Sequence, residues 1–496
     1  MRMRMSRRRA GWAILLCLCS AVRVSAMEPA DAASRVGREI ATTAGRVVTY
    51  PAPAECVPAP EYTVRVAGHE VFVHDQPTAA FCHFSCAGAV DVVVQARQDI
   101  RRVDLRPARL GVKPEIDGPR VRFTLPRPAH VSVEIDGDEK RPLLVFASPL
   151  EENPPREGDP KVLYFAPGKI HELGKVSLEA GQTVYIAGGA VVRAMFVSYQ
   201  PDVKILGRGI LEAGVRREQV FWMVGAHNLH LEGLVVASRE PNWTTKIFRS
   251  RGVRLRNLKI VNPANCGDGI DLCGCQDARV EDCFIQTKDD CISVKGNKWS
   301  ENEPVDGLRI ERCVLWNTTW GCAFRLGGET QAPYMRNIAM RDCDVLHADH
   351  WGGDKLEGVF NIHVAHYAEV SDVLFADCDV IHDKGREWTL RVYHCDSATV
   401  SNIRFENIRV EESKRLISAW IGKAVWSRDA ERGHIRDVDF RNINASGDPL
   451  RVELKGFDAQ HQVEKVLLEN VRVNGRPLTV ADVKTNEFAR QVTVRP

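Results

Sequence analysis

The strongest constraint on the fold of this chain is a six-residue phrase that recurs between residues 229 and 471. Its nine copies end 24 to 35 residues apart. Each copy alternates apolar and polar side chains, which is the period of a β-strand and not of a helix. One strand per repeat, with loops of variable length between the repeats, is typical of a β-solenoid. The copies read LHLEGL, VRLRNL, ARVEDC, LRIERC, IAMRDC, VLFADC, IRFENI, VDFRNI and VLLENV.

The last position of the phrase accounts for many of the cysteines. Four consecutive copies place Cys283, Cys313, Cys343 and Cys378 where the other copies place Leu, Ile or Val. A free cysteine behaves as a small hydrophobic side chain, so we expect these four to pack in the interior of the solenoid. A zinc site is not expected, because CGC at residues 273–275 lacks a second properly spaced pair or a nearby histidine. Disulfides stay open for Cys56, Cys82 and Cys86, and the state of Cys266, Cys273, Cys275, Cys291, Cys322 and Cys395 is undecided.

The front of the chain has a different pattern. Residues from about 60 to 150 contain short alternating strands separated by Gly, Pro and Asp turns with no repeat period, which predicts an antiparallel sandwich. The Pro-rich, charged segment 149–160 is typical of a linker. We therefore predict a signal peptide over residues 1–26, a β-sandwich domain with its linker over 27–160, and a parallel β-helix catalytic domain over 161–496.

The first residues predict export. MRMRMSRRR is followed by the apolar run AGWAILLCLCSAV and the small-residue ending VSA, the pattern of a secretory signal. A membrane anchor is the weaker alternative, because the run is shorter than the ~20 residues of a spanning helix. We expect a secreted or periplasmic protein. Removing this leader leaves 61 basic against 65 acidic residues, a net charge of −4, so no basic field for nucleic acid is expected.

Three carboxylates are the candidate catalytic groups. Asp268 lies in CGDGID, and Asp289 and Asp290 follow in KDDCIS, 21 and 22 residues later. Successive turns of a solenoid lie ~4.8 Å apart, so we expect these acids to converge on one outward face. Carboxyl groups held that closely raise one another's proton affinity, so one can keep its proton while another is ionised, as glycosidic cleavage requires. The alternative is that the acids only cap turns, and Asp271 is the less secure candidate.

The strings NCGDGID and DDCISVK resemble the active-site signature of polygalacturonases, glycoside hydrolase family 28. In the front half, LLVFASP, VLYFAPG, TVYIAGGAVV and GRGIL resemble the family 49 dextranases and isopullulanases. Both families are right-handed parallel β-helices with an inverting mechanism, so the resemblance implies an all-β chain in which such a solenoid follows a small antiparallel β-sandwich. It also implies that Asp289 is the general acid and that Asp268 and Asp290 activate water, with a gap of ~6.5 to 9.5 Å between acid and base.

The chain departs from family 28 at the residues that read the substrate. The family's GHG string is replaced by WGCAFRLGGE, with Gly321 or Cys322 where the histidine would stand. The best counterpart of its RIK string, which holds a uronate carboxylate, is residues 355–357, where Glu357 replaces the second cation. An acid there would repel a carboxylate, which puts plain galacturonan in doubt.

Other residues favour a carbohydrate. Lys295, Arg325 and Lys355 recur at intervals of 30 residues, which predicts a ladder of cations for a carboxylate or sulfate if the turns register simply. The alternative for these three is a solvated face balanced by acids. Tyr393 in RVYHC stands where the family has a tyrosine beside the sugar, although a packed tyrosine is the alternative. Tryptophans predicted in the loops of these turns suit sugar stacking: Trp299, Trp316, Trp320, Trp351 and Trp388.

These observations predict an exported inverting glycoside hydrolase that needs no cofactor or metal. A pectic or other acidic glycan is the first expectation for its substrate. Two alternatives remain: a polysaccharide lyase or uronate C5-epimerase, often Ca²⁺-dependent, and a non-catalytic carbohydrate-binding solenoid. The oligomeric state is left open.

Overall fold

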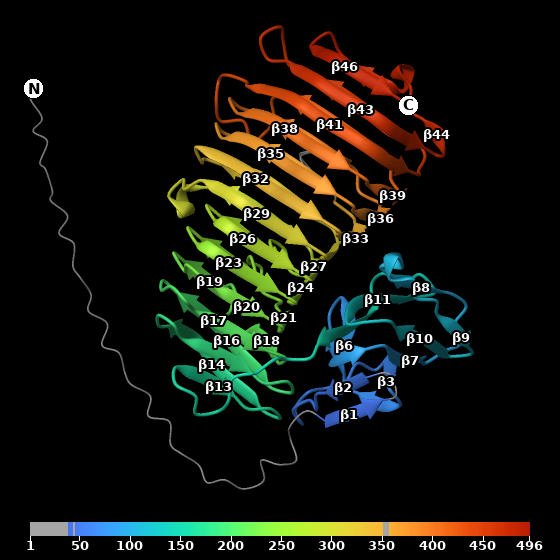
Figure 1. The fold of residues 1–496 in the computed structure, drawn as a ribbon, viewed down its shortest axis with the longest axis vertical. Helices are drawn as coiled ribbons and strands as arrows, with labels where there is room; N and C mark the ends of the chain where they lie inside the picture. Colours follow the sequence, from blue (N-terminus) through green and yellow to red (C-terminus); the bar gives the residue numbers. More distant parts are fainter. Residues whose placement is uncertain (1–37, 43–44, 351–356) are drawn as a thin grey trace, which may run out of the picture. The chain divides into compact units, whose positions relative to one another are not determined.

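The computed structural model describes residues 38–42, 45–350 and 357–496. The expected leader at residues 1–26 lies outside these ranges, as do Trp351 and Lys355. All described residues belong to one compact unit. Among them, no helix is long and apolar enough to span a membrane. Figure 1 shows two sheets of a sandwich beside a tall coil of strands.

The front of the chain forms two sheets. The first joins β1–β2–β6–β12–β11–β8, with β5 beside β6, and the second joins β4–β3–β7–β10–β9. Every pairing is antiparallel except β6 with β12, which is parallel. The first sheet comprises β1 Arg38–Thr42, β2 Gly45–Thr49, β5 Val73–Gln76, β6 Ala79–Gly88, β8 Val103–Arg106, β11 Ala129–Ile135 and β12 Leu143–Pro149. The second comprises β3 Tyr62–Val66, β4 His69–Val71, β7 Val90–Ala96, β9 Glu115–Asp117 and β10 Arg120–Leu125, and the 3-10 turn η2 spans Ala108–Leu110.

The rest of the described chain is a right-handed parallel β-helix, as the phrase repeat predicted. Its strands form one continuous coiled sheet with three faces. The first face carries the phrases, and its central position stacks in register from Leu231 through Leu255 to Leu468. Its strands are β13 Val162–Phe165, β15 Thr183–Ile186, β17 Lys204–Gly207, β20 His230–Glu232, β23 Arg251–Arg256, β26 Gln276–Glu281, β29 Val305–Glu311, β32 Tyr334–Arg341, β35 Glu369–Ala376, β38 Thr399–Glu406, β41 His434–Ala445, β43 Val463–Val473 and β46 Ala489–Arg495.

The second and third faces follow within each turn. At the N-terminal end, the long strands β14 Ile170–Leu178 and β16 Val191–Ser198 run along both faces, and β41 extends from the first face onto the second. The second face comprises β18 Ile210–Ala213, β21 Val235–Ala237, β24 Lys259–Asn262, β27 Phe284–Thr287, β30 Val314–Asn317, β33 Asp344–Ala348, β36 Asp379–Asp383 and β39 Arg409–Glu412. The third comprises β19 Phe221–Val224, β22 Thr245–Phe248, β25 Ile270–Cys273, β28 Ile292–Gly296, β31 Phe324–Thr330, β34 Gly358–Val364, β37 Trp388–His394, β40 Arg415–Ile421, β42 Arg451–Lys455 and β45 Val483–Thr485. Short elements complete the chain: η3 Lys298–Ser300, β44 Arg476–Pro477 and η4 Val480–Asp482.

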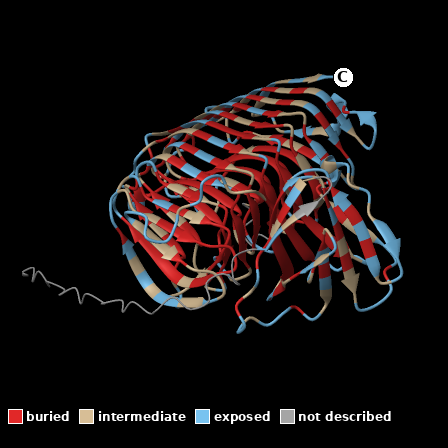
Figure 2. Ribbon diagram, turned by 60° about the horizontal axis from the view of Figure 1, so that its bottom comes forward, coloured by how far each residue is buried: buried red, intermediate tan, exposed pale blue. Residues whose placement is uncertain are grey.

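The interior of the solenoid is apolar along its whole length, which Figure 2 shows as a continuous buried stack. Cys283, Cys313, Cys343 and Cys378 are fully buried in this stack as free thiols, which confirms their predicted packing. Each of the other described cysteines is also a free thiol, including the three for which a disulfide was open. Burial and not cross-linking therefore accounts for most of the cysteines in this chain.

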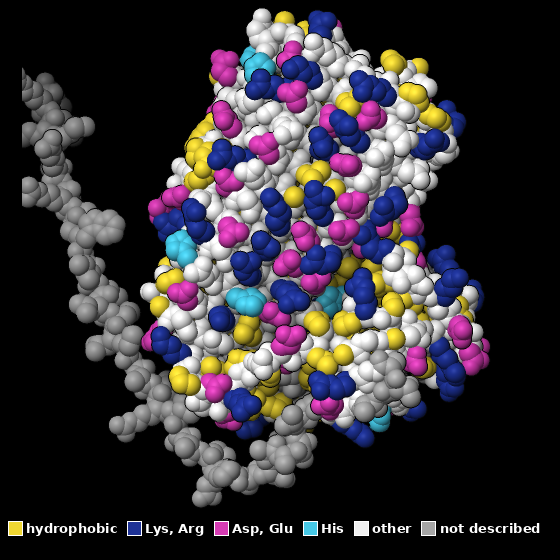
Figure 3. All heavy atoms as spheres, in the orientation of Figure 1, with side chains coloured by type: hydrophobic (Ala, Val, Ile, Leu, Met, Phe, Trp, Pro, Cys, Tyr) yellow, Lys and Arg dark blue, Asp and Glu magenta, His cyan; other side chains and the backbone are white. Residues whose placement is uncertain are grey.

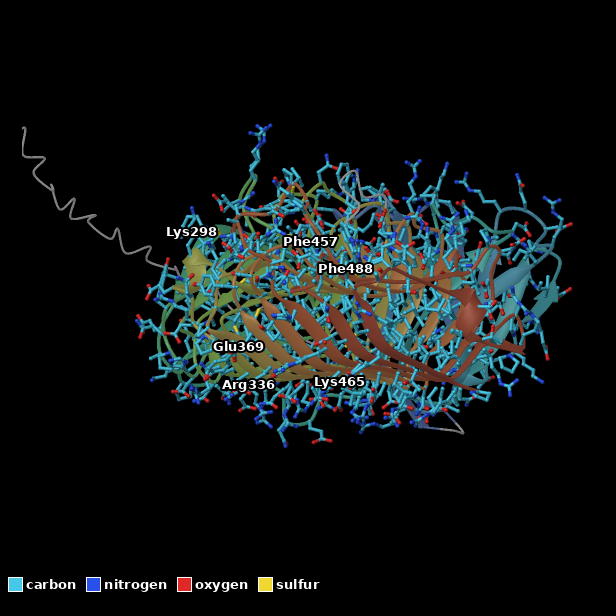
Figure 4. All side chains as sticks on the ribbon, turned by 90° about the horizontal axis from the view of Figure 1, so that it is seen from above. Lys298, Arg336, Glu369, Phe457, Lys465 and Phe488 are labelled. Atoms are coloured by element: carbon cyan, nitrogen blue, oxygen red, sulfur yellow. The ribbon has the colours of Figure 1, made fainter. Side chains whose placement is uncertain are left out.

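The outward side of the first face is charged. Figure 3 shows cationic and acidic side chains interspersed over its strands, with no field of one sign. Arg336, Glu369 and Lys465 are exposed on three strands of this face, and Figure 4 shows them along the same side of the solenoid. This face presents an ordinary solvated surface.

The sandwich lies against the second face. Phe81 and Phe146, from β6 and β12, pack with outward residues of that face such as Phe284 and Trp316. The rings of Phe146 and Phe284 are 5.2 Å apart. Because the first face is charged and the second is covered, the outward side chains of the third face are the ones left to build a site.

Candidate active site

The outward side chains of the third face form two parallel ladders, because strand residues alternate between interior and exterior. The first ladder runs in register through Trp222, Lys246, Asp271, Ser293, Arg325, Asn361 and Arg391. The second lies two residues further along each strand and runs through Val224, Phe248, Cys273 and Lys295. Polar and aromatic side chains therefore line one strip of the solenoid.

Three acids converge at the N-terminal edge of this strip. One carboxylate oxygen from each of Asp268, Asp289 and Asp290 lies within 4.8 Å of the others. The main chain holds them there, because Gly269 N donates to Asp290 O and Cys291 N donates to Cys322 O on the next turn. The expected convergence is therefore present, whereas the separation is shorter than the ~6.5 to 9.5 Å expected between the acid and the base of an inverting enzyme.

The three acids differ in their surroundings. Asp268 and Asp290 are 2% and 3% exposed, and Asp289 is the more accessible one. Burial, and then the neighbouring Asp290 carboxylate, raise the pKa of Asp289 above its usual range. Burial, and then the Asp271 carboxylate, raise the pKa of Asp268 well above its usual range. Asp289 thus combines access with a raised proton affinity, the properties of a general acid.

Asp290 is held by three donors. The Nε atom of Arg325 lies 2.9 Å from its Oδ2 atom, the backbone N of Cys322 lies 2.8 Å from Oδ1, and the Ser293 hydroxyl lies 3.2 Å from Oδ2. Arg325 supplies the positive charge that an ionised Asp290 requires in a buried position. Burial works to lower the pKa of Arg325, and the Asp290 carboxylate outweighs it, so the guanidinium stays charged.

Lys295 binds the other two acids. Its Nζ atom lies 3.2 Å from Asp268 Oδ2 and 2.9 Å from Asp271 Oδ1. It also lies 3.5 Å from the ring centroid of Trp243, a cation–π contact. Burial works to lower the pKa of Lys295, but the Asp271 and Asp268 carboxylates raise it well above the usual range. Burial raises the pKa of Asp271 to about 6, against the lowering effect of this lysine.

The prediction of a single cation ladder was wrong. Arg325 stands level with Ser293, and Lys295 follows Cys273 on the second ladder. Equal spacing in sequence failed because the register between β28 and β31 shifts after Val294. Lys295 and Arg325 instead contact different carboxylates, and the third predicted member, Lys355, lies outside the described residues.

The counterparts of the family's histidine are small. Gly321 has a φ of +69°, and an added Cβ would lie 2.5 Å from Asp289 Oδ1. A larger residue there would displace the candidate acid. Cys322 is buried and takes part through its backbone N–H. Neither position can place an imidazole beside Asp289.

The other predicted substrate residues are placed in three ways. Glu357 is half-buried just before β34, and burial raises its pKa. Trp320 is 39% exposed in the turn that follows Asn317, whose side-chain amide donates to the Trp320 carbonyl. Tyr393 is fully buried between the rings of His363 and Trp420, at 5.2 and 4.7 Å, which favours the packing alternative.

Two of the expected loop tryptophans lie in strands. Trp316 is 2% exposed in β30 and stacks on His347 with a centroid distance of 4.1 Å. Trp388 begins β37 and is 8% exposed. Trp299, in η3, is 60% exposed, as expected of a loop residue.

Several residues of the strip escaped the sequence reasoning. Asn361 and His363 are the outward residues of β34, the strand that follows Arg325 on the next turn. Arg391 follows them and binds Glu387 at 3.1 Å. Trp222 and Trp243 flank Lys246. Only the observed register identifies these positions, because the loops between turns vary in length.

Comparisons with known proteins agree with this architecture. Residues 210–321, which contain all three candidate acids, match the family model described as "Glycosyl hydrolases family 28". A "Probable polygalacturonase" of Vitis vinifera is 30% identical over 95 residues, which are 18% of this chain and 19% of that protein. The similarity thus spans about a fifth of the relative's length.

Two solved structures share the fold over nearly the whole chain. Dex49A from Penicillium minioluteum has a TM-score of 0.61 at 13% identity and covers 92% of this chain and 100% of its own. The catalytic domain of Agl-KA has a TM-score of 0.50 at 11% identity, covering 91% and 90%. The resemblance to family 28 is therefore confirmed for the turns that carry Asp268, Asp289 and Asp290, and the sandwich-plus-solenoid architecture is one that Dex49A shares.

Proposed function

We propose that this protein is a glycoside hydrolase that cleaves a glycan chain with Asp289 as general acid. The observation that carries the proposal is the convergence of Asp289 with Asp268 and Asp290 inside the segment that matches family 28. Asp289 donates its proton to the glycosidic oxygen as the C1–O bond breaks. Water attacks C1 from the opposite side and gives its proton to the Asp268–Asp290 pair.

Inversion at C1 is part of the proposal and rests on the resemblance to family 28. The close approach of the three carboxylates does not argue for it, because retaining enzymes have the shorter separation of ~5 to 5.5 Å. Proton NMR of the first product decides the point. An inverting enzyme releases the anomer opposite to that of the substrate, and a retaining enzyme releases the same anomer.

The cations of the strip bear on the substrate. Lys295, Arg325 and Arg391 each form an ion pair with an acid of the protein. An acidic glycan would have to compete for them, so the expected pectic substrate has less support from these residues than a simple cation ladder would have given. We propose a polysaccharide or its oligosaccharides as the substrate, with acidic and neutral chains tested side by side.

The test is a panel of polysaccharides assayed for new reducing ends with the wild-type protein and the Asp289→Asn variant. We expect kcat to fall about 10²- to 10⁴-fold, the usual contribution of a general acid, with binding retained. Asp277→Asn is the matched control, because Asp277 is an exposed acid on the same turn with a φ of 48° that asparagine tolerates. Full activity in Asp289→Asn would refute the assignment.

The same assay separates the lyase and epimerase alternatives. Three carboxylate oxygens within 4.8 Å could also hold a divalent cation, as many lyases require. A lyase would release an unsaturated, ultraviolet-absorbing product and lose activity with a chelator. The proposed hydrolase does neither, and a non-catalytic binding protein would produce no reducing ends with any glycan.

A further inference from the structure

Next to the carboxylates, the N-terminal part of the third face carries a group of aromatic side chains. Tyr199 follows β16, Trp222 lies in β19, and Trp243 precedes β22. Trp222 Nε1 donates to the Tyr199 hydroxyl at 3.2 Å, and the Trp222 ring packs 5.4 Å from that of Phe248. Tyr199 is 61% exposed, and the two tryptophans are half-buried.

Lys246 stands between the two tryptophans. Its Nζ atom lies 5.6 Å from the ring centroid of Trp222 and 5.1 Å from that of Trp243. It forms no ion pair with any described residue, in contrast to Lys295 and Arg325. Burial lowers its pKa. Its N–H donors are therefore available to a hydroxyl or carboxylate of a ligand.

A depression adjoins these rings on the side away from the acids. It has a volume of about 330 Å³, and its lining combines aromatic, thioether, amide and charged side chains. Hydrophobic faces with a few placed polar groups are the usual lining of a sugar site. The lining includes Tyr199, Trp222, Met195, Lys175, Glu218 and Gln219.

The register gives the distance to the chemistry. Trp222 pairs with Lys246, and Lys246 pairs with Asp271, so Trp222 lies two rungs, ~10 Å, from the acidic cluster. Trp243 spans the interval, because its ring contacts both Lys246 and Lys295. The aromatic surface and the carboxylates are thus parts of one continuous strip.

We propose that Tyr199, Trp222, Lys246 and Trp243 form a glycan-binding subsite that stacks the sugar rings of an extended chain on the N-terminal side of the cleaved bond. This rests on the proposed glycosidase function and adds a requirement for chain length. The chain lies along the solenoid axis, with ring faces on the tryptophans and Lys246 donating to a sugar oxygen. Stacking of this kind accepts neutral sugars, and the single available cation accommodates at most one carboxylate there.

The test compares oligosaccharides of increasing length, prepared from whichever polysaccharide the protein cleaves. We expect Trp222→Ala to raise KM at least tenfold for long oligomers and to leave kcat near the wild-type value. The shortest cleaved oligomer should be unaffected. Trp222→Phe keeps an aromatic face and should retain most of the affinity. Trp426→Ala is the control, because Trp426 is 46% exposed but lies beyond β40, several turns away.

Binding is measured separately, so that failure of the subsite and failure of the glycosidase proposal are distinguishable. Affinity electrophoresis of Asp289→Asn, with and without Trp222→Ala, reports glycan binding without turnover. Loss of retardation only in the Trp222→Ala protein supports the subsite. Equal length dependence and equal retardation in wild type and Trp222→Ala overturn the subsite and leave the glycosidase intact. Tyr199→Ala repeats the test at an exposed residue, where folding is not at risk.

Discussion

At the residue scale, Lys295 is the cation that holds two buried carboxyl groups in place. A buried ammonium group without acids would be unstable, and the buried Asp268 and Asp271 would each favour their protonated form. Lys295 links them at 3.2 and 2.9 Å, so the proton affinity of both acids depends on it. It is a positioning residue by this geometry.

Replacing Lys295 with methionine should shift the pH profile. The lysine lowers the pKa of Asp268 and Asp271, so its loss raises both. If water activation needs an ionised carboxylate, activity falls as the pH drops through the pKa of that group. The acid limb of kcat/KM should therefore move to higher pH by about one unit. The measurement is kcat/KM from pH 3 to pH 9, with the exposed Lys298→Met as control. An unmoved acid limb would show that Asp268 and Asp271 do not govern activity.

The candidate acids could be predicted from sequence because they lie on adjacent turns, where spacing translates directly into proximity. Asp268 is followed after 21 and 22 residues by Asp289 and Asp290, and one turn separates them. The cation ladder could not be predicted, because a register shift after Val294 changes which residue of the next turn stands level. Trp222 and Trp243 were missed for a related reason. Their role depends on neighbours two turns away.

At the scale of the element, the phrase strand specifies its own corner. The residue before the last position of the phrase adopts a left-handed conformation, with φ of 52° at Asn257, 56° at Asp282 and 55° at Asn407. Asn and Asp tolerate this conformation better than other residues with a Cβ. The alternation and the corner are both local, which explains why the first face was predictable to within two residues.

The buried cysteines follow the corner. Cys283 and Cys343 donate their thiol protons to the carbonyl two residues earlier, at 3.3 and 3.1 Å. Weak donors therefore meet carbonyl groups at the turn while the sulfur fills the apolar stack. Other turns fill the same position with Leu, Ile or Val, so the thiol is a packing group and its hydrogen bond is secondary.

Replacing Cys343 with valine should be tolerated. The two side chains are close in volume, and we expect the free energy of unfolding to change by less than ~1.5 kcal/mol. Cys343→Ser, which buries a hydroxyl in the apolar stack, should cost more. Thermal unfolding of the wild type with and without a reductant completes the test. A fall in Tm on reduction would show that stabilising disulfides are present.

At the scale of the whole molecule, the sandwich and the solenoid stabilise each other through the second face. Their junction combines the Phe146–Phe284 contact with ion pairs at its edge. Arg109 of the sandwich lies 2.8 Å from Asp344 and 3.1 Å from Asp379 of the solenoid. Arg106 forms two hydrogen bonds of 2.8 Å with Glu411. The sequence predicted two parts but did not indicate where they meet.

Asp344 should make the stability of this junction pH-dependent. Burial raises its pKa to about 7 although Arg109 is adjacent. The unfolded chain ionises this group near pH 4, so the free energy of unfolding falls as the pH rises from about 4 to about 7. Asparagine mimics the protonated form. We expect Asp344→Asn to exceed the wild type by about 1 to 3 kcal/mol at pH 8 and to match it near pH 4.

Chemical denaturation at the two pH values measures this difference. Asp342→Asn is the control, because its side chain is 57% exposed and lies 3.9 Å from Arg109. A variant less stable than the wild type at pH 8 would mean that the pair with Arg109 outweighs the cost of burying the charge.

The apolar stripe beneath the sandwich bears on how the protein can be handled in the laboratory. A truncated version that starts at Val162 would keep every strand of the coil and the acidic cluster, yet it would present Phe284 and Trp316 to water along one flank. Such a flank invites self-association. Recombinant production of an active fragment should therefore retain the N-terminal sheets, whose practical value is to keep the coil in solution.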